Sequence, residues 1–213
     1  IRDVERSRGL GDVYKRQVLN DNGKLIGYNT DGYGFMQSVR DAGHDITGKN
    51  ITVMGVGGAS MAICAQSALD GAASVHIFAR RTSRYWNRTQ KFAENLSAKT
   101  GCQVCLFDND DHTALRDSIA QSYLLINATS VGMVPDIDDT IIKDTSLFHP
   151  ELVVADVVYE PQETRLLREA KAAGCQTFNG MYMLLHQGAK AFQIWTGQEM
   201  PVSVIKEKYF SVK

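Results

Sequence analysis

Three short stretches of the sequence hold residues whose types and spacing suit binding and chemistry. The first, Gly55–Ser60 (GVGGAS), follows a short apolar run and opens a stretch of small and apolar residues at helical spacing. In this strand–turn–helix context Gly55 permits the tight turn, and Gly57 lets the backbone approach a pyrophosphate at the helix N-terminus. The pattern predicts a dinucleotide site. The third fingerprint position holds Ser60, where Gly or Ala is usual, and the alternative is a structural glycine turn in another α/β protein.

The second stretch, Phe78–Arg84 (FARRTSR), follows the next predicted strand and contains Arg80, Arg81 and Arg84. Folds that bind NAD usually place an acid there for the ribose 2′-OH, but this stretch is followed by no Asp or Glu until Glu94. A guanidinium group matches a phosphate dianion through two parallel hydrogen bonds, whereas a hydroxyl needs no such clamp. The arginines therefore predict the 2′-phosphate of NADP. NAD is the second choice of cofactor, and a solvated basic helix start is the alternative role.

The third stretch, Ile26–Phe35 (IGYNTDGYGF), places Asp31 on a glycine-bounded turn ahead of the glycine-rich loop. In doubly wound sheets, ligands bind beyond the carboxyl ends of the strands. Asn127–Met133 (NATSVGM) and Val157–Pro161 (VVYEP) also follow predicted strands. We therefore expect all these segments, with Asp31, to meet at one crevice. The alternative for Asp31 is a turn former or a helix N-cap.

The elements that must position these residues alternate regularly along the chain. Strands are predicted at 51–56, 74–79, 102–107, 123–128, 152–159 and 175–179, and helices at 58–71, 86–100, 111–121, 163–174 and 181–197. Gly71, Gly101 and Gly174 lie where three of these helices should stop. Strands that alternate with helices of these lengths form βαβ units with right-handed crossovers. We predict an α/β fold with a Rossmann-like doubly wound parallel sheet.

Composition excludes several classes of function. The chain has 213 residues, 44% hydrophobic and 22% charged, with a net charge of −1, so no basic field attracts nucleic acid or an anionic membrane. No apolar stretch has the length of a membrane span, and the first residues lack the apolar core of a secretory signal. Four cysteines do not make a disulfide scaffold. We expect a cytoplasmic monomer or homodimer whose partner is a small-molecule substrate.

Two cysteines form a CxxC motif, Cys102 and Cys105 in GCQVCLF. A metal or redox site is one interpretation. However, an offset of three on a strand points the two thiols to opposite faces, and no second CxxC or paired histidine completes a zinc site. The motif is better explained as part of a buried strand, and we predict no metal.

Five segments, in this order, resemble the shikimate/quinate dehydrogenase family: GYNTDGYGF, GVGGASMA, NATSVGM, DVVYEPQETRLLREAKAAG and GMYMLLHQGAKAFQIWTG. The resemblance covers about residue 18 to residue 210. It implies an enzyme in which a small N-terminal substrate domain and an NADP-binding Rossmann domain face each other across a cleft. It also implies interconversion of 3-dehydroshikimate and shikimate (or the quinate pair), in aromatic amino acid biosynthesis, with hydride passing between the substrate carbon and nicotinamide C4.

The resemblance also assigns roles to matching positions. Asp31 matches the family's catalytic aspartate, which works with a lysine on the reacting hydroxyl, because an alcohol that loses hydride must also lose its proton. The positions that match substrate contacts are Asn29, Asp31, Tyr159 and Gln187. Those that match cofactor contacts are Gly55, Val56, Gly57, Gly58, Ala59, Arg80, Arg81, Arg84, Thr129, Ser130, Val157 and Gly180.

Two of these positions have simpler alternatives. Tyr159 could cap a strand, and Gln187 could lie on a helix surface. Gln187 follows Met183 by one helical turn on an otherwise apolar face, which favours a buried polar role. His186 adjoins Gln187 and should point elsewhere on the helix, so we assign it no role.

The first 17 residues (IRDVERSRGLGDVYKRQ) resemble nothing in the family, and its VTxPFK-like segment with the catalytic lysine has no counterpart here. We expect a non-native leader at 1–17, a substrate-site turn and connecting helix at 18–45, the NADP-binding domain at 46–180, and helices at 181–213 that pack on a missing substrate domain. Such a fragment should bind cofactor and turn over poorly. The alternative is a non-catalytic NADP-binding module. The NTDG and VYEPQETRLL segments argue against a methylenetetrahydrofolate dehydrogenase.

Overall fold

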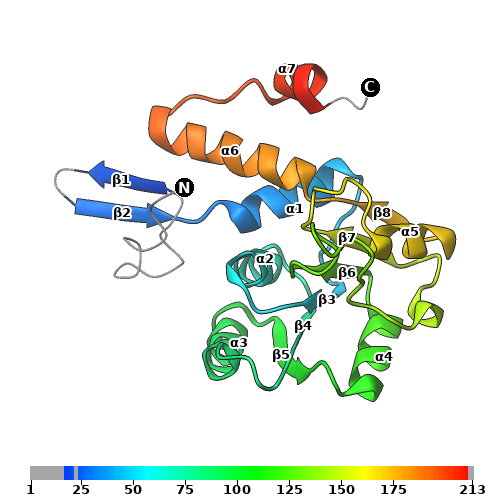
Figure 1. The fold of residues 1–213 in the computed structure, drawn as a ribbon. Helices are drawn as coiled ribbons and strands as arrows, with labels where there is room; N and C mark the ends of the chain where they lie inside the picture. Colours follow the sequence, from blue (N-terminus) through cyan, green and yellow to red (C-terminus); the bar gives the residue numbers. More distant parts are fainter. Residues whose placement is uncertain (1–16, 22–23, 211–213) are drawn as a thin grey trace.

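The protein is described by a computed structural model that covers residues 17–21 and 24–210. The leader predicted at 1–17 lies outside these residues except for Gln17. One layer of parallel strands carries helices on both faces, and a two-stranded hairpin projects from the first helix (Figure 1). Within the described part of the chain, no helix has both the length and the apolar character needed to cross a membrane.

The central sheet consists of six parallel strands in the order β5-β4-β3-β6-β7-β8. Their bounds are β3 (Asn50–Met54), β4 (Ser74–Ala79), β5 (Gln103–Asp108), β6 (Leu124–Asn127), β7 (Val153–Asp156) and β8 (Gln176–Phe178). The chain moves outwards from β3 to β5, returns to the other side of β3 with β6, and moves outwards again to β8. Doubly wound sheets bind ligands where the strand order reverses in this way. The predicted Rossmann-like fold is confirmed.

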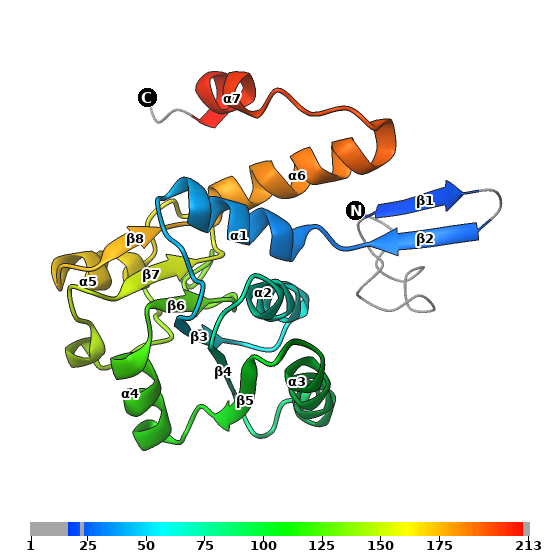
Figure 2. The same ribbon diagram turned by 180° about the vertical axis from the view of Figure 1, so that it is seen from behind.

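Alternate side chains of each strand enter two separate cores, because neighbouring residues of a strand point to opposite faces. Ile51 and Val53 lie in the first core, and Met54 lies in the second. The first face is covered by α1 (Asp31–Asp41), α2 (Gly58–Leu69), α3 (Trp86–Thr100) and α6 (Met181–Thr196). The second face is covered by α4 (His112–Gln121) and α5 (Arg165–Ala172), which lie across the sheet from α2 and α3 (Figure 2).

The helix ends follow the sequence signals. The glycines after α2, α3 and α5, which are Gly71, Gly101 and Gly174, have φ angles of +90°, +76° and +91°, a conformation that side chains disfavour. At the start of α4 the carboxylate of Asp111 accepts a hydrogen bond of 2.9 Å from the Ala114 backbone N–H. The predicted glycine stops are therefore confirmed.

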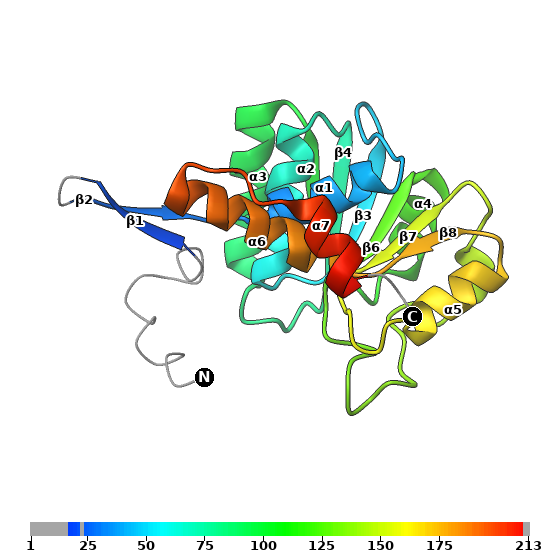
Figure 3. The same cartoon turned by 90° about the horizontal axis from the view of Figure 1, so that it is seen from above.

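Several elements differ from the predicted ones. The fourth and fifth strands are shorter than expected, and β7 ends at Asp156 rather than Tyr159. An antiparallel pair, β1 (Gln17–Asp21) and β2 (Lys24–Tyr28), precedes α1 and was not predicted. The described part of the chain ends with α7 (Val202–Ile205) and η4 (Lys206–Phe210), beyond α6, which lies along α1 (Figure 3). A short 3-10 helix, η3 (Thr145–Leu147), lies between β6 and β7.

The cysteines are free thiols at Cys64, Cys102, Cys105 and Cys175. Cys102 precedes β5 and is buried in the first core, while Cys105 within β5 is half-buried. Burial raises the pKa of the Cys102 thiol, and it raises that of Cys64 to about 12. These thiols therefore stay protonated and unreactive near neutral pH. Across residues 17–21 and 24–210, no three His, Cys, Asp or Glu side chains form a group that could hold a metal ion.

Candidate functional site

The glycine-rich loop leaves the centre of the sheet and leads directly into α2. Gly55 has a φ of +109°, and a Cβ there would lie 2.8 Å from Thr129 Cγ2. Gly57 is the N-cap of α2, and a Cβ on Gly57 or Gly58 would meet no atom within 4 Å. The first turn of α2 is therefore open to a ligand, and its N–H groups favour phosphate. Ser60, the residue that departs from the usual fingerprint, is fully buried and donates a 2.6 Å hydrogen bond to the Gly55 carbonyl oxygen. This bond links the two ends of the glycine-rich loop.

A cavity of about 360 Å³ lies beside this loop. Gly57 and Gly58 form part of its wall, and Asn29 and Gly32 form another part. Most of the remaining wall comes from α2 and α3. The cavity thus connects the predicted substrate turn with the predicted phosphate loop. Among the residues that the structure describes, none of the three predicted arginines lines it.

Two of the predicted arginines, Arg81 and Arg84, stack on aromatic rings. Both are exposed and follow the end of β4. The Arg81 guanidinium carbon lies 4.8 Å from the centroid of the Trp86 ring. Arg84 lies 4.7 Å from the Tyr85 ring centroid, and its Nη2 donates a 2.6 Å hydrogen bond to the Tyr85 hydroxyl. Guanidinium groups stack well on aromatic faces, and stacking leaves N–H groups at the edge available to an anion.

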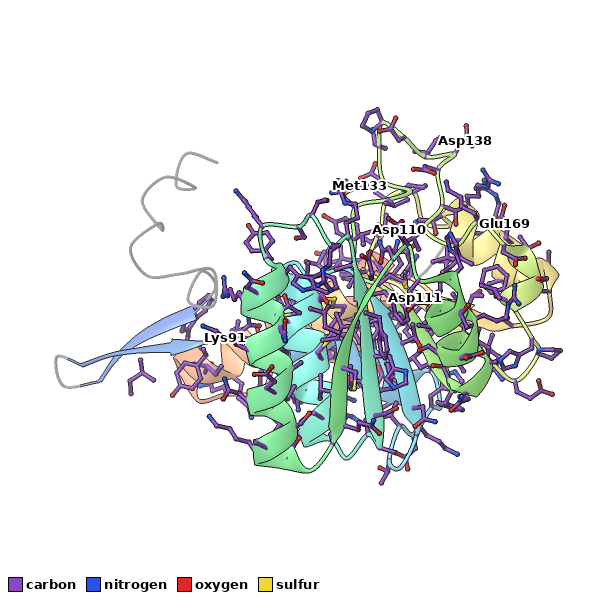
Figure 4. The ribbon with its side chains drawn as sticks, turned by 90° about the horizontal axis from the view of Figure 1, so that it is seen from below. Lys91, Asp110, Asp111, Met133, Asp138 and Glu169 are labelled. Atoms are coloured by element: carbon purple, nitrogen blue, oxygen red, sulfur yellow. The ribbon has the colours of Figure 1, made fainter. Side chains whose placement is uncertain are left out.

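Sequence reasoning missed a carboxylate that binds the backbone of Arg80–Arg84, here called the arginine loop. Asp108, the last residue of β5, is paired in register with the end of β4. Its Oδ1 accepts backbone N–H groups from Arg81 at 3.3 Å and from Asp110 at 3.2 Å. Figure 4 shows Asp110 and Asp111 on the loop that follows β5. Asp108 therefore fixes the start of the arginine loop, and only the pairing of β4 with β5 reveals it.

The residues predicted for the nicotinamide side come from the loops after β6 and β7. Thr129 touches Gly55 of the glycine-rich loop, as described above. A Cβ on Gly180 would lie 2.1 Å from the Val157 carbonyl oxygen, so the start of α6 rests on the loop after β7. Tyr159 is 45% exposed and lies beyond the end of β7, so it does not cap the strand. The loop after β6 therefore contacts the glycine-rich loop, and the loop after β7 contacts the start of α6, while Tyr159 is exposed to solvent.

Asp31 is the first residue of α1 and is only 5% exposed. The N-cap position belongs to Thr30, so Asp31 does not take the alternative role of N-cap. The backbone N–H of Asp31 donates to Asn29 Oδ1 at 2.9 Å, which orders the turn before the helix. A carboxylate at a helix N-terminus is stabilised by the helix dipole. The turn thus holds a buried acid between Asn29 and Gly32, which line the cavity, while Asp31 itself does not line it.

Two glycines let α1 pass very close to its neighbours. A Cβ on Gly32 would lie 2.2 Å from the Ala62 carbonyl oxygen of α2, and one on Gly34 would lie 2.6 Å from the Gln187 backbone nitrogen of α6. Asp31 and Gly34 are three residues apart and share one side of α1. The half-buried Gln187 of α6 lies at the position where Gly34 meets that helix. This crossing sets α1, which begins with the predicted acid, against α6, which carries the predicted amide.

His186 makes a second contact between α1 and α6. Its ring is buried, and Nε2 lies 2.9 Å from Oδ2 of Asp41. Lys206 of η4 places its Nζ 3.8 Å from the same oxygen, and Gln37 donates to the other oxygen at 3.0 Å. His186 thus contacts the C-terminal end of α1, while Asp31 lies at the opposite end. The partner is 145 residues away in the sequence, so no local pattern predicted this contact.

We expect the substitution Asp41→Asn to lower the free energy of unfolding at neutral pH by about 1 kcal/mol. Burial raises the pKa of Asp41, but the Gln37 hydrogen bond, the interactions with His186 and the charge of Lys206 outweigh burial and hold the pKa below 3.8. A carboxylate with a lowered pKa stabilises the fold above its unfolded-state pKa and loses that contribution as the pH falls through the folded value.

Urea unfolding of both proteins should therefore show a constant stability difference from about pH 7 to about pH 5. The difference should shrink below about pH 4, where Asp41 becomes protonated first in the unfolded state. A difference that persisted unchanged at lower pH would show that the carboxylate charge is not its source.

A Rossmann-like sheet with an open glycine-rich loop at its switch point defines the class of dinucleotide-binding α/β domains. The family model described as the Shikimate 5'-dehydrogenase C-terminal domain matches residues 180–208, which include α6. The chain belongs to the shikimate dehydrogenase family.

Individual relatives agree with this assignment. The chain is 51% identical over 193 residues to a Listeria innocua protein named Shikimate dehydrogenase (NADP(+)), which covers 91% of this chain. The crystal structure of shikimate 5-dehydrogenase from Listeria monocytogenes, in complex with shikimate and NAD, has 50% identity and a TM-score of 0.85 over 89% of this chain. The Aquifex aeolicus shikimate dehydrogenase has 31% identity and a TM-score of 0.72, over 97% of this chain and 74% of its own. This chain spans 66% of the length of the Listeria innocua protein and 65% of the Listeria monocytogenes chain.

Proposed function

We propose that this chain binds NADP and acts in the NADP-dependent interconversion of shikimate and 3-dehydroshikimate, with quinate as an alternative substrate. The contact between Gly32, in the first turn of α1, and Ala62 of α2 carries this proposal. It places the buried Asp31 beside the helix whose N-terminus holds the glycine-rich loop. The identity of 51% to a protein named Shikimate dehydrogenase (NADP(+)) supports the same substrate class and the same place in aromatic amino acid synthesis.

The chemistry assigns one task to each group. Nicotinamide supplies or accepts the hydride when it is bound. Asp31 would hold the reacting hydroxyl and accept its proton in the direction of oxidation. Gln187, across the helix crossing, would orient neighbouring hydroxyl groups of the substrate, and Tyr159 would approach from the loop after β7. The family's lysine has no counterpart in the 213 residues, so we expect this chain, assayed alone, to turn over slowly.

The choice between NADP and NAD is proposed to depend on the arginine loop. We expect Arg80→Ala to raise the Kd for NADP about tenfold, because a charge-assisted hydrogen bond to phosphate is lost, and to leave the Kd for NAD nearly unchanged. Isothermal titration calorimetry with both coenzymes measures the ratio. Arg116→Ala removes the same charge from α4, on the opposite face of the sheet, and should leave the ratio unaltered. An unchanged ratio in Arg80→Ala would remove the 2′-phosphate clamp from the proposal.

A second candidate function is NADP binding without catalysis. The residues proposed for cofactor binding are all present in these 213 residues. Reduction of NADP by shikimate, followed with a large excess of chain over coenzyme, distinguishes the two functions. Slow shikimate-dependent reduction supports the first, and calorimetric NADP binding without any reduction supports the second. Failure to bind either coenzyme would contradict both.

We also propose a cytoplasmic monomer or homodimer that acts on small molecules rather than on nucleic acid or membrane. The free thiols fit a reducing compartment, and the net charge of −1 gives no attraction to polyanions. Light scattering of the purified chain measures its assembly state.

A further inference from the structure

The last residues of β6 and β7 form a buried polar pair that sequence analysis left without a role. Asn127 and Asp156 are both 0% exposed, and they lie opposite each other in the register of the two strands. Asn127 Nδ2 donates a 3.0 Å hydrogen bond to Asp156 Oδ1. A carboxylate with no exposure is stable only where donors replace the water that it has lost, so its other partners matter.

On one side of the pair, the loop after β6 folds around Asn127. Its Oδ1 accepts hydrogen bonds from the Thr129 N–H at 3.1 Å and from the Thr129 hydroxyl at 2.7 Å. Its Nδ2 also donates to the Val131 carbonyl oxygen at 3.1 Å. The same amide therefore fixes both the backbone and the side chain of Thr129. In Figure 4, Met133 and Asp138 mark the continuation of this loop.

On the other side, the loop after β7 folds around Asp156. Its Oδ1 also accepts the Val158 N–H at 3.0 Å, and its Oδ2 accepts the hydroxyl of Thr164 at 2.8 Å. Thr164 is the N-cap of α5 and is fully buried. Burial raises the pKa of Asp156, while Asn127, Val158 and Thr164 all donate to it, and an ionised carboxylate accepts from all three.

The two loops held in this way carry Thr129 and Val157, which contact the glycine-rich loop and the start of α6 respectively. We propose that Asn127 and Asp156 are positioning residues for the nicotinamide half of the dinucleotide, because they fix the two loops that form its wall. This inference rests on the proposed function. The arginine loop follows β4, on the other side of β3, so the adenosine half of the ligand should not depend on this pair.

This separation gives a direct test with two ligands. NADP contains both halves, whereas adenosine 2′,5′-bisphosphate contains the adenosine and the 2′-phosphate without nicotinamide. For Asp156→Ala we expect the calorimetric Kd of NADP to rise about tenfold or more, and that of the bisphosphate to change less than about twofold. Asp156→Asn keeps an oxygen that accepts from Asn127 and Val158, so it should restore the NADP affinity to within about threefold of the original.

A merely structural role would give a different pattern. Ser118→Ala removes a buried hydroxyl of α4 that lies 2.6 Å from Thr52 Oγ1 of β3. We expect it to lower the melting temperature and to leave both Kd values unchanged. If Asp156→Ala does not fold, Thr164→Val removes the bond to Oδ2 together with the α5 cap bond from the Leu167 N–H, and it should weaken NADP binding by a smaller factor while leaving the Kd of the bisphosphate unchanged.

Two results would overturn the inference. Equal loss of NADP and bisphosphate affinity would show general damage to the domain, and no loss of NADP affinity would show that the loops hold their places without Asp156. If the unaltered chain bound neither ligand, the proposed function would fail and this inference with it. If it bound both and Asp156→Ala left both affinities unchanged, this inference alone would fail.

Discussion

Replacing Asp31 with asparagine should lower the rate of shikimate-dependent NADP reduction by about 10² or more, because an amide cannot accept the proton that the alcohol must lose. Asparagine has nearly the same size, and the Asp31 backbone N–H would keep its bond to Asn29. NADP binding should therefore change little. The rate is measured in single turnovers with chain in excess over coenzyme, so that a slow reaction of this chain remains visible.

A matched control removes a carboxylate outside the crevice. Asp45 lies in the exposed turn after α1, where it accepts hydrogen bonds from Thr47. Asp45→Asn should leave the rate within about twofold of the original. If Asp31→Asn reduced NADP as fast as the unaltered chain, the acid–base role of Asp31 would be wrong.

The second large effect is expected at the crossing of α1 and α6. A Cβ on Gly34 would lie 2.6 Å from the Gln187 backbone nitrogen and 2.7 Å from the Met183 carbonyl oxygen. These are backbone atoms of a helix, so no side chain can rotate away, and the helices must separate. We expect Gly34→Ala to lower the free energy of unfolding by about 3 kcal/mol. In a chain of this length that corresponds to a fall of roughly 6–12 °C in Tm.

Gly188 provides a control in the same pair of helices. It lies within α6 and is exposed, and a Cβ there would meet no atom within 4 Å. Gly188→Ala should stabilise the protein by about 0.5–1 kcal/mol, because alanine favours the helix over glycine. Thermal unfolding followed by circular dichroism measures both variants. Similar changes in the two would mean that the close crossing does not decide the stability.

The order of the elements and the position of the glycine-rich loop were predictable because they follow from local patterns. Short apolar runs indicate buried strands, and a 3.6-residue repeat of apolar residues indicates helices. Gly71, Gly101 and Gly174 mark helix ends, where the backbone needs a positive φ. The position of the glycine-rich loop at the switch point follows from the same alternation. The roles of the individual site residues remain predictions.

The missing parts of the prediction have two causes. The hairpin at residues 17–28 carries a readable signal, Asn22-Gly23 between two apolar stretches, which is typical of two-residue hairpin loops. The other features depend on partners far apart in the sequence. β7 ends at Asp156, whose carboxylate accepts hydrogen bonds from the Val158 N–H and the Thr164 hydroxyl. His186 contacts Asp41, which lies 145 residues away in the sequence. Such contacts are decided by packing, and no local period reports them.

Ser60 has a consequence for the kinetics of ligand binding. Its buried hydroxyl spans the glycine-rich loop and bonds to the Gly55 carbonyl oxygen, so the loop acquires its shape when the chain folds. A coenzyme would meet a pre-organised cradle and would lose little free energy to ordering it. Association should then be set by diffusion and orientation, and differences in residence time should report the quality of the contacts.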